Sequence, residues 1–336
     1  MGLFDDTKYA TSYIEPIDGH VSHLRHLSKG ITAKQLLKKQ FGFSEGDASK
    51  TSQLLMRHVE QALYFFEGSR NVGAELRPVL QYYSYLNLAV ACILAYRPKE
   101  WEKYRGHGVQ DETRSIARVQ LNSRVVKVCK GAVSLFSAIL SDGGIQRRKL
   151  SIRDLVVGIP WLGSELDQVF PTSTYEIGVT SGVEKYEKSK LHSRFGFLLI
   201  KSPNARSPVR IPRRKIERAM PMLNAQYELH ASTSESLTYR SLQAWTEGNH
   251  DRALRTCHEH MLKFSNFGGQ EYRIARQPGV FGASSDVFVT HYMWRSANHV
   301  PLMPTLTSAL ILSFVLSSLV RDRPHLCRQV ERSSLN

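Results

Sequence analysis

Residues 73–96 read GAELRPVLQYYSYLNLAVACILAY, a run that is apolar on nearly every side when it is wound as an α-helix. Pro78 lies near its start and Pro98 just past its end, which are positions that proline favours at helix boundaries. Because a helix that is apolar all round is normally buried, we expect this segment to be a central helix of the fold. One polar stripe interrupts it, formed by Arg77, Gln81 and Ser84, with Asn87 at its edge.

Other segments supply both helices and strands. The spacing of apolar residues predicts helices over 49–67, 131–140, 151–162, 212–223, 249–264 and 304–321. Alternating apolar and polar residues predict strands within 114–128 and over 175–180, 195–200, 227–231, 237–242 and 272–276. Helices at both ends of a strand-rich middle region predict an α+β fold.

We expect three regions along the chain. Residues 1–140 are mainly helical and residues 141–300 are rich in strands with short helices. Residues 301–336 carry a C-terminal core helix that returns to pack on the N-terminal helices, so all three regions can form one compact unit. The apolar run over 302–320 approaches the length of a membrane span, but six Ser and Thr residues dilute it. We therefore expect a buried core helix there.

The net charge is +15, and most of it is concentrated in two stretches. Residues 19–44 contain five Lys or Arg, three His and no acid, and residues 201–220 contain seven Lys or Arg and one Glu. Clustered bases of this kind favour a polyanion partner, so we expect nucleic acid, DNA or RNA. The expected phosphate contacts are Lys34, Lys38, Lys39, Arg210, Arg213, Arg214, Lys215 and Arg218. The alternative is two solvated basic faces that bind no ligand.

The sequence also bears on location and cofactors. The first 13 residues, MGLFDDTKYATSY, contain two acids and no apolar core of the length that a signal peptide needs. The four cysteines are isolated, with no C-x-x-C pair. The P-loop, the G-x-G-x-x-G fingerprint and the G-x-S-x-G elbow are absent. We therefore expect a cytoplasmic protein that has no cofactor and no contact with a membrane.

Four short pieces of the chain resemble the YaaC-like family of bacterial proteins. They are RPVLQYYS (77–84) with NLA (87–89), GHG (106–108), LSIRDL (150–155) leading to IP (159–160), and LSSLVRDRP (316–324). Their order and spacing span most of the chain. The family pattern has tyrosine where this chain has Asp322 and tryptophan where it has Cys327, and it usually runs on further. The resemblance implies a bacterial, cytosolic protein and no particular activity.

Two polar stripes are candidates for an anion site. The stripe that includes Arg77 has a counterpart at 313, 317 and 321, where Ser313, Ser317 and Arg321 share one side of the C-terminal helix. If both stripes face one cavity, Arg77, Arg321 and Arg323 can hold a phosphate or carboxylate. Alternatively, each arginine caps carbonyl groups or pairs with a structural acid such as Asp154 or Asp322.

Histidines supply the candidate catalytic residues. His107 lies between two glycines that let a ligand approach the backbone, although a turn with an incidental histidine fits equally. Residues 257–260 read CHEH, but consecutive helical residues diverge by about 100° and cannot converge on one ion, so we expect no metal site. This helix should bury His258 and expose His260. The pairs Arg252 with His258 and Arg255 with His260 match the loose R-x4-6-H spacing of HEPN-type ribonucleases, which need no metal.

The leading hypothesis is a nucleic-acid-binding protein or an accessory subunit of a larger assembly, such as a phage-defence complex. One alternative is a metal-independent HEPN-like ribonuclease, and another is a structural subunit whose basic faces meet an acidic protein. Trp245, in the polar segment 243–249, is the candidate for stacking on a base.

Overall fold

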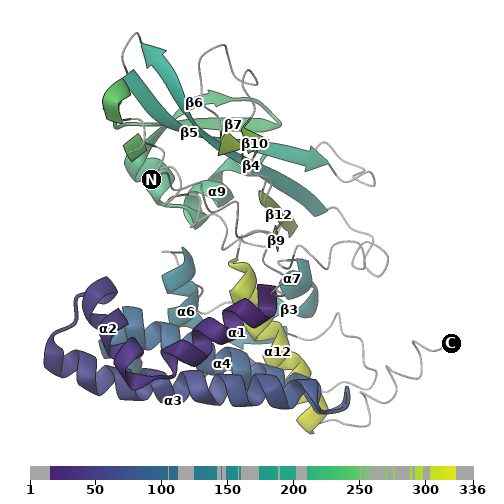
Figure 1. The fold of residues 1–336 in the computed structure, drawn as a ribbon. Coiled ribbons are helices and arrows are strands. Elements are labelled where there is room, and N and C mark those ends of the chain that lie inside the picture. Colours follow the sequence, from purple (N-terminus) through teal and green to yellow (C-terminus); the bar gives the residue numbers. More distant parts are fainter. Residues whose placement is uncertain are drawn as a thin grey trace. The chain divides into compact units, whose positions relative to one another are not determined.

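The computed structural model describes residues 16–104, 106–112, 125–141, 145, 149–157, 159, 174–187, 190–201, 210–249, 252–253, 256, 260, 269–270, 275–276, 288–289, 292–297 and 303–322. The chain divides into two compact units, Met1–Arg105 and Gly106–Asn336. The three regions expected from the sequence, with boundaries at residues 140 and 300, stay a prediction. Figure 1 shows the elements, which are helices together with antiparallel sheets in the middle of the chain. The expected α+β class is confirmed.

The described part of the first unit is helical. Its helices are α1 (Pro16–Leu27), α2 (Gly30–Phe41), α3 (Glu45–Arg70), α4 (Arg77–Tyr96) and α5 (Pro98–Lys103). Helix α3 begins four residues before the expected start at 49, because the Ser44 hydroxyl accepts a hydrogen bond from the Asp47 N–H at 3.2 Å. Glu45 and Asp47 in its first turn also interact favourably with the positive end of the helix dipole.

Helices α3 and α4 pack against each other, and polar residues of α4 hold the contact (Figure 1). The Ser84 hydroxyl donates to the Ala62 carbonyl at 2.9 Å. The Asn87 side chain lies 2.7 Å from His58 Nδ1 and donates to the Tyr83 carbonyl. Since the Asn87 oxygen can only accept, His58 donates to it. Part of the expected polar stripe is therefore a helix–helix contact.

Helix α4 is long and apolar enough to cross a membrane, by length and composition, and 50% of its most apolar window is buried within the structure. A core helix of a soluble protein passes the same test. Apolar side chains of α2, α3 and α4 form the core of this unit: Ala33, Leu37, Ala48, Leu55, Val59, Leu63, Ala91 and Ala95.

The second unit begins with a small antiparallel sheet in the order β1 (Val109–Asp111), β2 (Val125–Val128) and β3 (Lys149–Ser151). Helices α6 (Ala132–Ser141), α7 (Ile152–Val157) and α12 (Thr305–Asp322) accompany it, and α12 contacts α6, α7 and β1. Most side chains of α12 are buried, as expected for a core helix. The return of this helix to residues 73–96 stays a prediction.

A seven-stranded sheet forms the strand-rich middle. The order is β6 (Tyr227–Ser232), β7 (Ser236–Ser241), β5 (Lys190–Lys201), β4 (Thr174–Glu187), β12 (Tyr292–Ala297) and β9 (Gly269–Gln270), and β8 (Trp245–Thr246) also pairs with β5. Strands β10 (Ala275–Arg276) and β11 (Phe288–Val289) form a separate antiparallel pair. The β4–β5 hairpin keeps one register from Tyr175 opposite Lys201 to Lys185 opposite Leu191, and an irregularity between Lys185 and Glu187 shifts the last pair, Glu187 opposite Lys190.

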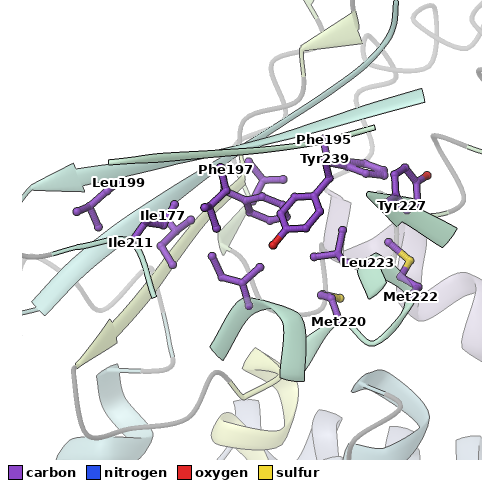
Figure 2. Close-up of a cluster of buried hydrophobic side chains, with 13 residues drawn as sticks. Ile177, Phe195, Phe197, Leu199, Ile211, Met220, Met222, Leu223, Tyr227 and Tyr239 are labelled. Carbon is purple, nitrogen blue, oxygen red and sulfur yellow. The ribbon is translucent and has the colours of Figure 1, made fainter. Parts of the chain in front are cut away.

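Two short helices, α9 (Arg213–Ala219) and α10 (Met222–Gln226), cover one face of this sheet, and η4 (Glu247–Asn249) follows β8. Figure 2 shows the core between the sheet and these two helices, where aromatic residues of the strands lie over Met220, Met222 and Leu223 of the helical segment. The largest contributors from the sheet are Phe195, Phe197, Tyr227 and Tyr239. Trp245 is only 6% exposed and packs with Val183, Leu191 and Ala253. The expected role of Trp245 as a surface platform for a base was therefore wrong.

Candidate functional site

Helix α9 presents a basic surface from a well-anchored position. Pro212 precedes the helix, and the Ile211 N–H donates to the Ser234 carbonyl in the turn between β6 and β7 at 2.9 Å. Ile211, Ile216 and Met220 are buried in the core of the sheet, away from the exposed basic side chains. The core therefore fixes the position of α9 and of the basic side chains that project from its other side.

Arg210, Arg214 and Arg218 are spaced four residues apart, so they would lie in one row on a helix that began before residue 212. The helix begins at Arg213, so Arg214 and Arg218 share a side of α9 while Arg210 lies in the extended segment before it. All three side chains are exposed. None of the three has an ion-pair partner within the part of the chain that the structure describes.

The two other basic residues of this segment, Arg213 and Lys215, have different surroundings. Arg213 Nε lies 2.7 Å from Glu217 Oε1, which also accepts a hydrogen bond from the Tyr239 hydroxyl at 2.9 Å. The hydrogen bond with Glu217 raises the pKa of Arg213. The pKa of Tyr239 is raised mainly by burial and also by the hydrogen bond to the same carboxylate. Burial lowers the pKa of Lys215 to about 8. We name the exposed set, Arg210, Arg214 and Arg218, the α9 surface.

Two of the three lysines of α2 share one carboxylate, that of Glu45, which comes just after the acid-free stretch. Lys34 and Lys38 both form ion pairs with its carboxylate, the latter at 2.5 Å. Hydrogen bonds from these two lysines lower the pKa of Glu45 to about 2. Arg25 of α1 pairs in the same way with Glu67 of α3 at 2.8 Å. Lys39 is exposed and has no ion-pair partner among the described residues.

His107 lies in a loop that is fixed to the start of α6. The carbonyls of Gly106 and His107 accept hydrogen bonds from the N–H groups of Ala132 at 2.7 Å and Val133 at 3.1 Å. The Val109 N–H donates to His107 Nδ1 at 3.2 Å, and the imidazole stacks on Phe314 of α12 with 5.2 Å between ring centroids. Burial and the positive charge of Arg321 lower the pKa of His107.

The arginines of the two polar stripes have different surroundings. Arg77 is exposed and donates to the Val72 carbonyl at 3.3 Å, which agrees with the capping alternative. Arg321 is exposed in the last turn of α12, whereas Ser313 and Ser317 are buried. Arg323 lies outside the described residues. Arg77 belongs to the first unit and Arg321 to the second, so a cavity shared by both arginines stays a prediction.

A buried hydrogen-bonded chain links three segments of the second unit. The Tyr227 hydroxyl lies 2.6 Å from His260 Nδ1 and 3.1 Å from the Ser193 hydroxyl. His260 is buried, so the expectation that it faces solvent was wrong. The sequence did not reveal this hydrogen-bonded chain, because its three members lie far apart in sequence, on β5, on β6 and near residue 260. Only the alternation of Leu191, Ser193 and Phe195 signals that Ser193 points inward.

The candidates for HEPN-like catalysis are described only in part. Arg252 is exposed and both Arg252 and His260 are helical, whereas Arg255 and His258 lie outside the described residues. Neither Arg–His pair is therefore tested. The CHEH segment also falls mostly outside the described part, in which no cluster of three or more potential metal-ligating side chains occurs.

The comparisons with known proteins support the resemblance seen in the four short pieces. A family model described as "YaaC-like Protein" matches residues 25–333. The match continues past Asp322 and Cys327, where the chain departs from the family pattern. No curated protein matches the chain. Since the family model covers nearly the whole sequence, the chain belongs to the YaaC-like family.

Proposed function

We propose that this protein binds nucleic acid through the α9 surface, as a binding or accessory component without a catalytic role. The observation that carries the proposal is the set of three exposed arginines, Arg210, Arg214 and Arg218, that have no ion-pair partner among the described residues. Arg214 and Arg218 are four residues apart on one helix, a spacing at which like charges repel each other. A bound polyanion relieves this repulsion.

The α9 surface is favoured over residues 19–44 by the distribution of acids. Lys34 and Lys38 already share the Glu45 carboxylate, so a phosphate that binds there has to compete with an ion pair. On α9 the acid, Glu217, is only 14% exposed in its side chain and is occupied by Arg213 and Tyr239. Glu235 is an exposed acid in the turn whose Ser234 carbonyl accepts the Ile211 N–H.

Arginine suits phosphate because its planar guanidinium group presents several N–H donors in a fixed fork and is always charged. Three phosphate contacts predict that log Kobs for duplex DNA falls with log[salt] with a slope of about −2.7. No measurable affinity for nucleic acid at low salt would instead favour an acidic protein partner.

The test is a charge reversal with a matched control. The variant Arg210→Glu, Arg214→Glu, Arg218→Glu should melt like the parent, because exposed substitutions usually cost within about 0.5 kcal/mol each. It should lose about tenfold or more in affinity for labelled RNA and DNA, measured by fluorescence anisotropy at low salt. The control is Lys50→Glu, Arg57→Glu, Lys99→Glu, which makes the same change in net charge on exposed side chains of the first unit outside residues 19–44.

The control is expected to keep most of its affinity. Equal losses in the two triple variants would show that binding follows net charge alone, and a folded α9 variant that binds like the parent would refute the proposed surface. In the same samples, RNA incubated with the protein and EDTA should stay intact. Cleavage that survives EDTA and disappears in a folded His258→Ala or His260→Ala variant would replace the binding role with the ribonuclease alternative.

A further inference from the structure

The loop that carries His107 is held rigidly by close backbone contacts. Gly108 has φ +77°, and a Cβ on it would lie 2.9 Å from Gly131 Cα. A Cβ on Gly131 would in turn lie 2.7 Å from Gly108 Cα. Together with the two carbonyl bonds to the start of α6, this packing fixes the direction in which the imidazole projects. Gly106, by contrast, has open space where a side chain would lie.

The hydrogen bond from Val109 settles which ring nitrogen of neutral His107 carries the proton. A backbone N–H can only donate, so Nδ1 must accept and is unprotonated. The proton of the neutral ring is therefore on Nε2. Burial and Arg321 lower the pKa of His107, which favours this neutral form at neutral pH. In this state Nε2 is a hydrogen-bond donor and is unable to act as a general base.

The surroundings of the ring suit an oxygen anion. The Nε2–H group has no hydrogen-bond partner among the described residues, and His107 is exposed. Phe314 supports one face of the ring. Arg321 lies seven residues, or two turns, further along α12 on the same side of the helix, and it is the charged group that shifts the pKa of His107. The charge of Arg321 thus acts on the ring whose Nε2–H is the N–H donor.

We propose that His107 Nε2–H and Arg321 together bind the phosphate group of a phosphate monoester or of inorganic phosphate, in the open space beside Gly106. A phosphate dianion offers acceptor oxygens to both groups and carries more charge than a carboxylate. The role resembles that of a neutral catalytic histidine, which donates a hydrogen bond to a substrate oxygen while the imidazole stays uncharged. This site uses β1, α6 and α12, and it does not depend on the α9 surface.

The first measurement is the tautomer. Long-range ¹H–¹⁵N NMR of the full-length protein labelled at histidine should show Nδ1 unprotonated and Nε2 protonated in His107. Titration with inorganic phosphate or with a nucleoside monophosphate should raise the pKa of His107, because the anion offsets the charge of Arg321. Chloride at the same ionic strength should leave this pKa unchanged, and acetate should bind more weakly. A ring protonated on Nδ1, or equal effects of phosphate, acetate and chloride, would overturn the proposal.

Variants separate binding from loop structure. In His107→Asn the amide oxygen can still accept from Val109, but no atom lies at the Nε2 position, so phosphate affinity should fall by about tenfold. In His107→Gln an amide nitrogen lies near the Nε2 position and should restore much of the affinity. Arg321→Gln, an exposed change, should also lose about tenfold, whereas His23→Asn on α1 should have no effect. Phosphate affinity that stays at the parent level in Arg321→Gln and His107→Asn would refute the site, whether or not His107→Gln folds.

Discussion

Removing the hydroxyl of Tyr227 should destabilise the second unit, because this group is the centre of a buried hydrogen-bonded chain. In Tyr227→Phe the hydroxyl of Ser193, which is 0% exposed, and Nδ1 of His260 both lose a partner. A single hydrogen bond contributes roughly 1 kcal/mol, and each buried polar group left unpaired costs about 1–3 kcal/mol. We therefore expect the free energy of unfolding to fall by about 2–4 kcal/mol.

The assay is calorimetric unfolding together with hydrogen exchange of the β5 and β6 amides. A loss of this size corresponds to a decrease in Tm of about 5–10 °C for a unit of this length, and exchange should accelerate most around Ser193. Tyr64→Phe is the matched control, because Tyr64 is 76% exposed and its hydroxyl is solvated. If the free energy of unfolding of Tyr227→Phe is within about 0.5 kcal/mol of that of the parent, the hydrogen bonds of Tyr227 make no net contribution to stability and the reasoning is wrong.

Two further outcomes follow from the contacts described above. Gly108→Ala should destabilise the His107 loop, because the positive φ disfavours any other residue and the new Cβ would lie 2.9 Å from Gly131 Cα. Thermal melting measures this loss, and a Tm equal to that of the parent would contradict the contact. The Glu45 pair with Lys34 and Lys38 should stabilise α2 fully above the unfolded carboxyl pKa near 4.5 and lose that contribution as pH falls towards about 2, because the folded pKa is depressed. Glu45→Gln should abolish this acid dependence in α2 amide exchange, and an unchanged pH profile would show that the pairs contribute nothing.

The elements that the sequence predicted well are those whose apolar pattern is strong. Residues 73–96 and 304–321 form α4 and α12 within a few residues of the expected bounds, because the apolar residues that set the pattern are also the ones that become buried. Strand β4 was expected only over 175–180 yet extends to Glu187. Its second half pairs with β5 through inward positions occupied by Ser181 and Ser193, small polar residues that conceal the alternation.

The candidate sites were less predictable, because they depend on contacts between distant segments. Clusters of bases are visible in the sequence, but the acids that neutralise them are not: Glu45 follows the basic stretch of α2, and Glu67 reaches Arg25 from another helix. The burial of His260 was also mispredicted, because its hydrogen-bond partner, Tyr227, lies 33 residues away on a strand. Similarly, the polar neighbours of Trp245 gave no sign that the indole packs with Val183, Leu191 and Ala253.

The backbone on either side of residues 202–209 is tied to one turn of the sheet. The Leu199 N–H donates to the Glu235 carbonyl at 2.7 Å and the Ile211 N–H to the Ser234 carbonyl at 2.9 Å, so the connection leaves and rejoins the fold at adjacent residues. The distance that this connection has to span is therefore set by the turn and not by the length of the connection. The same turn therefore fixes both the end of β5 and the start of the segment that carries α9.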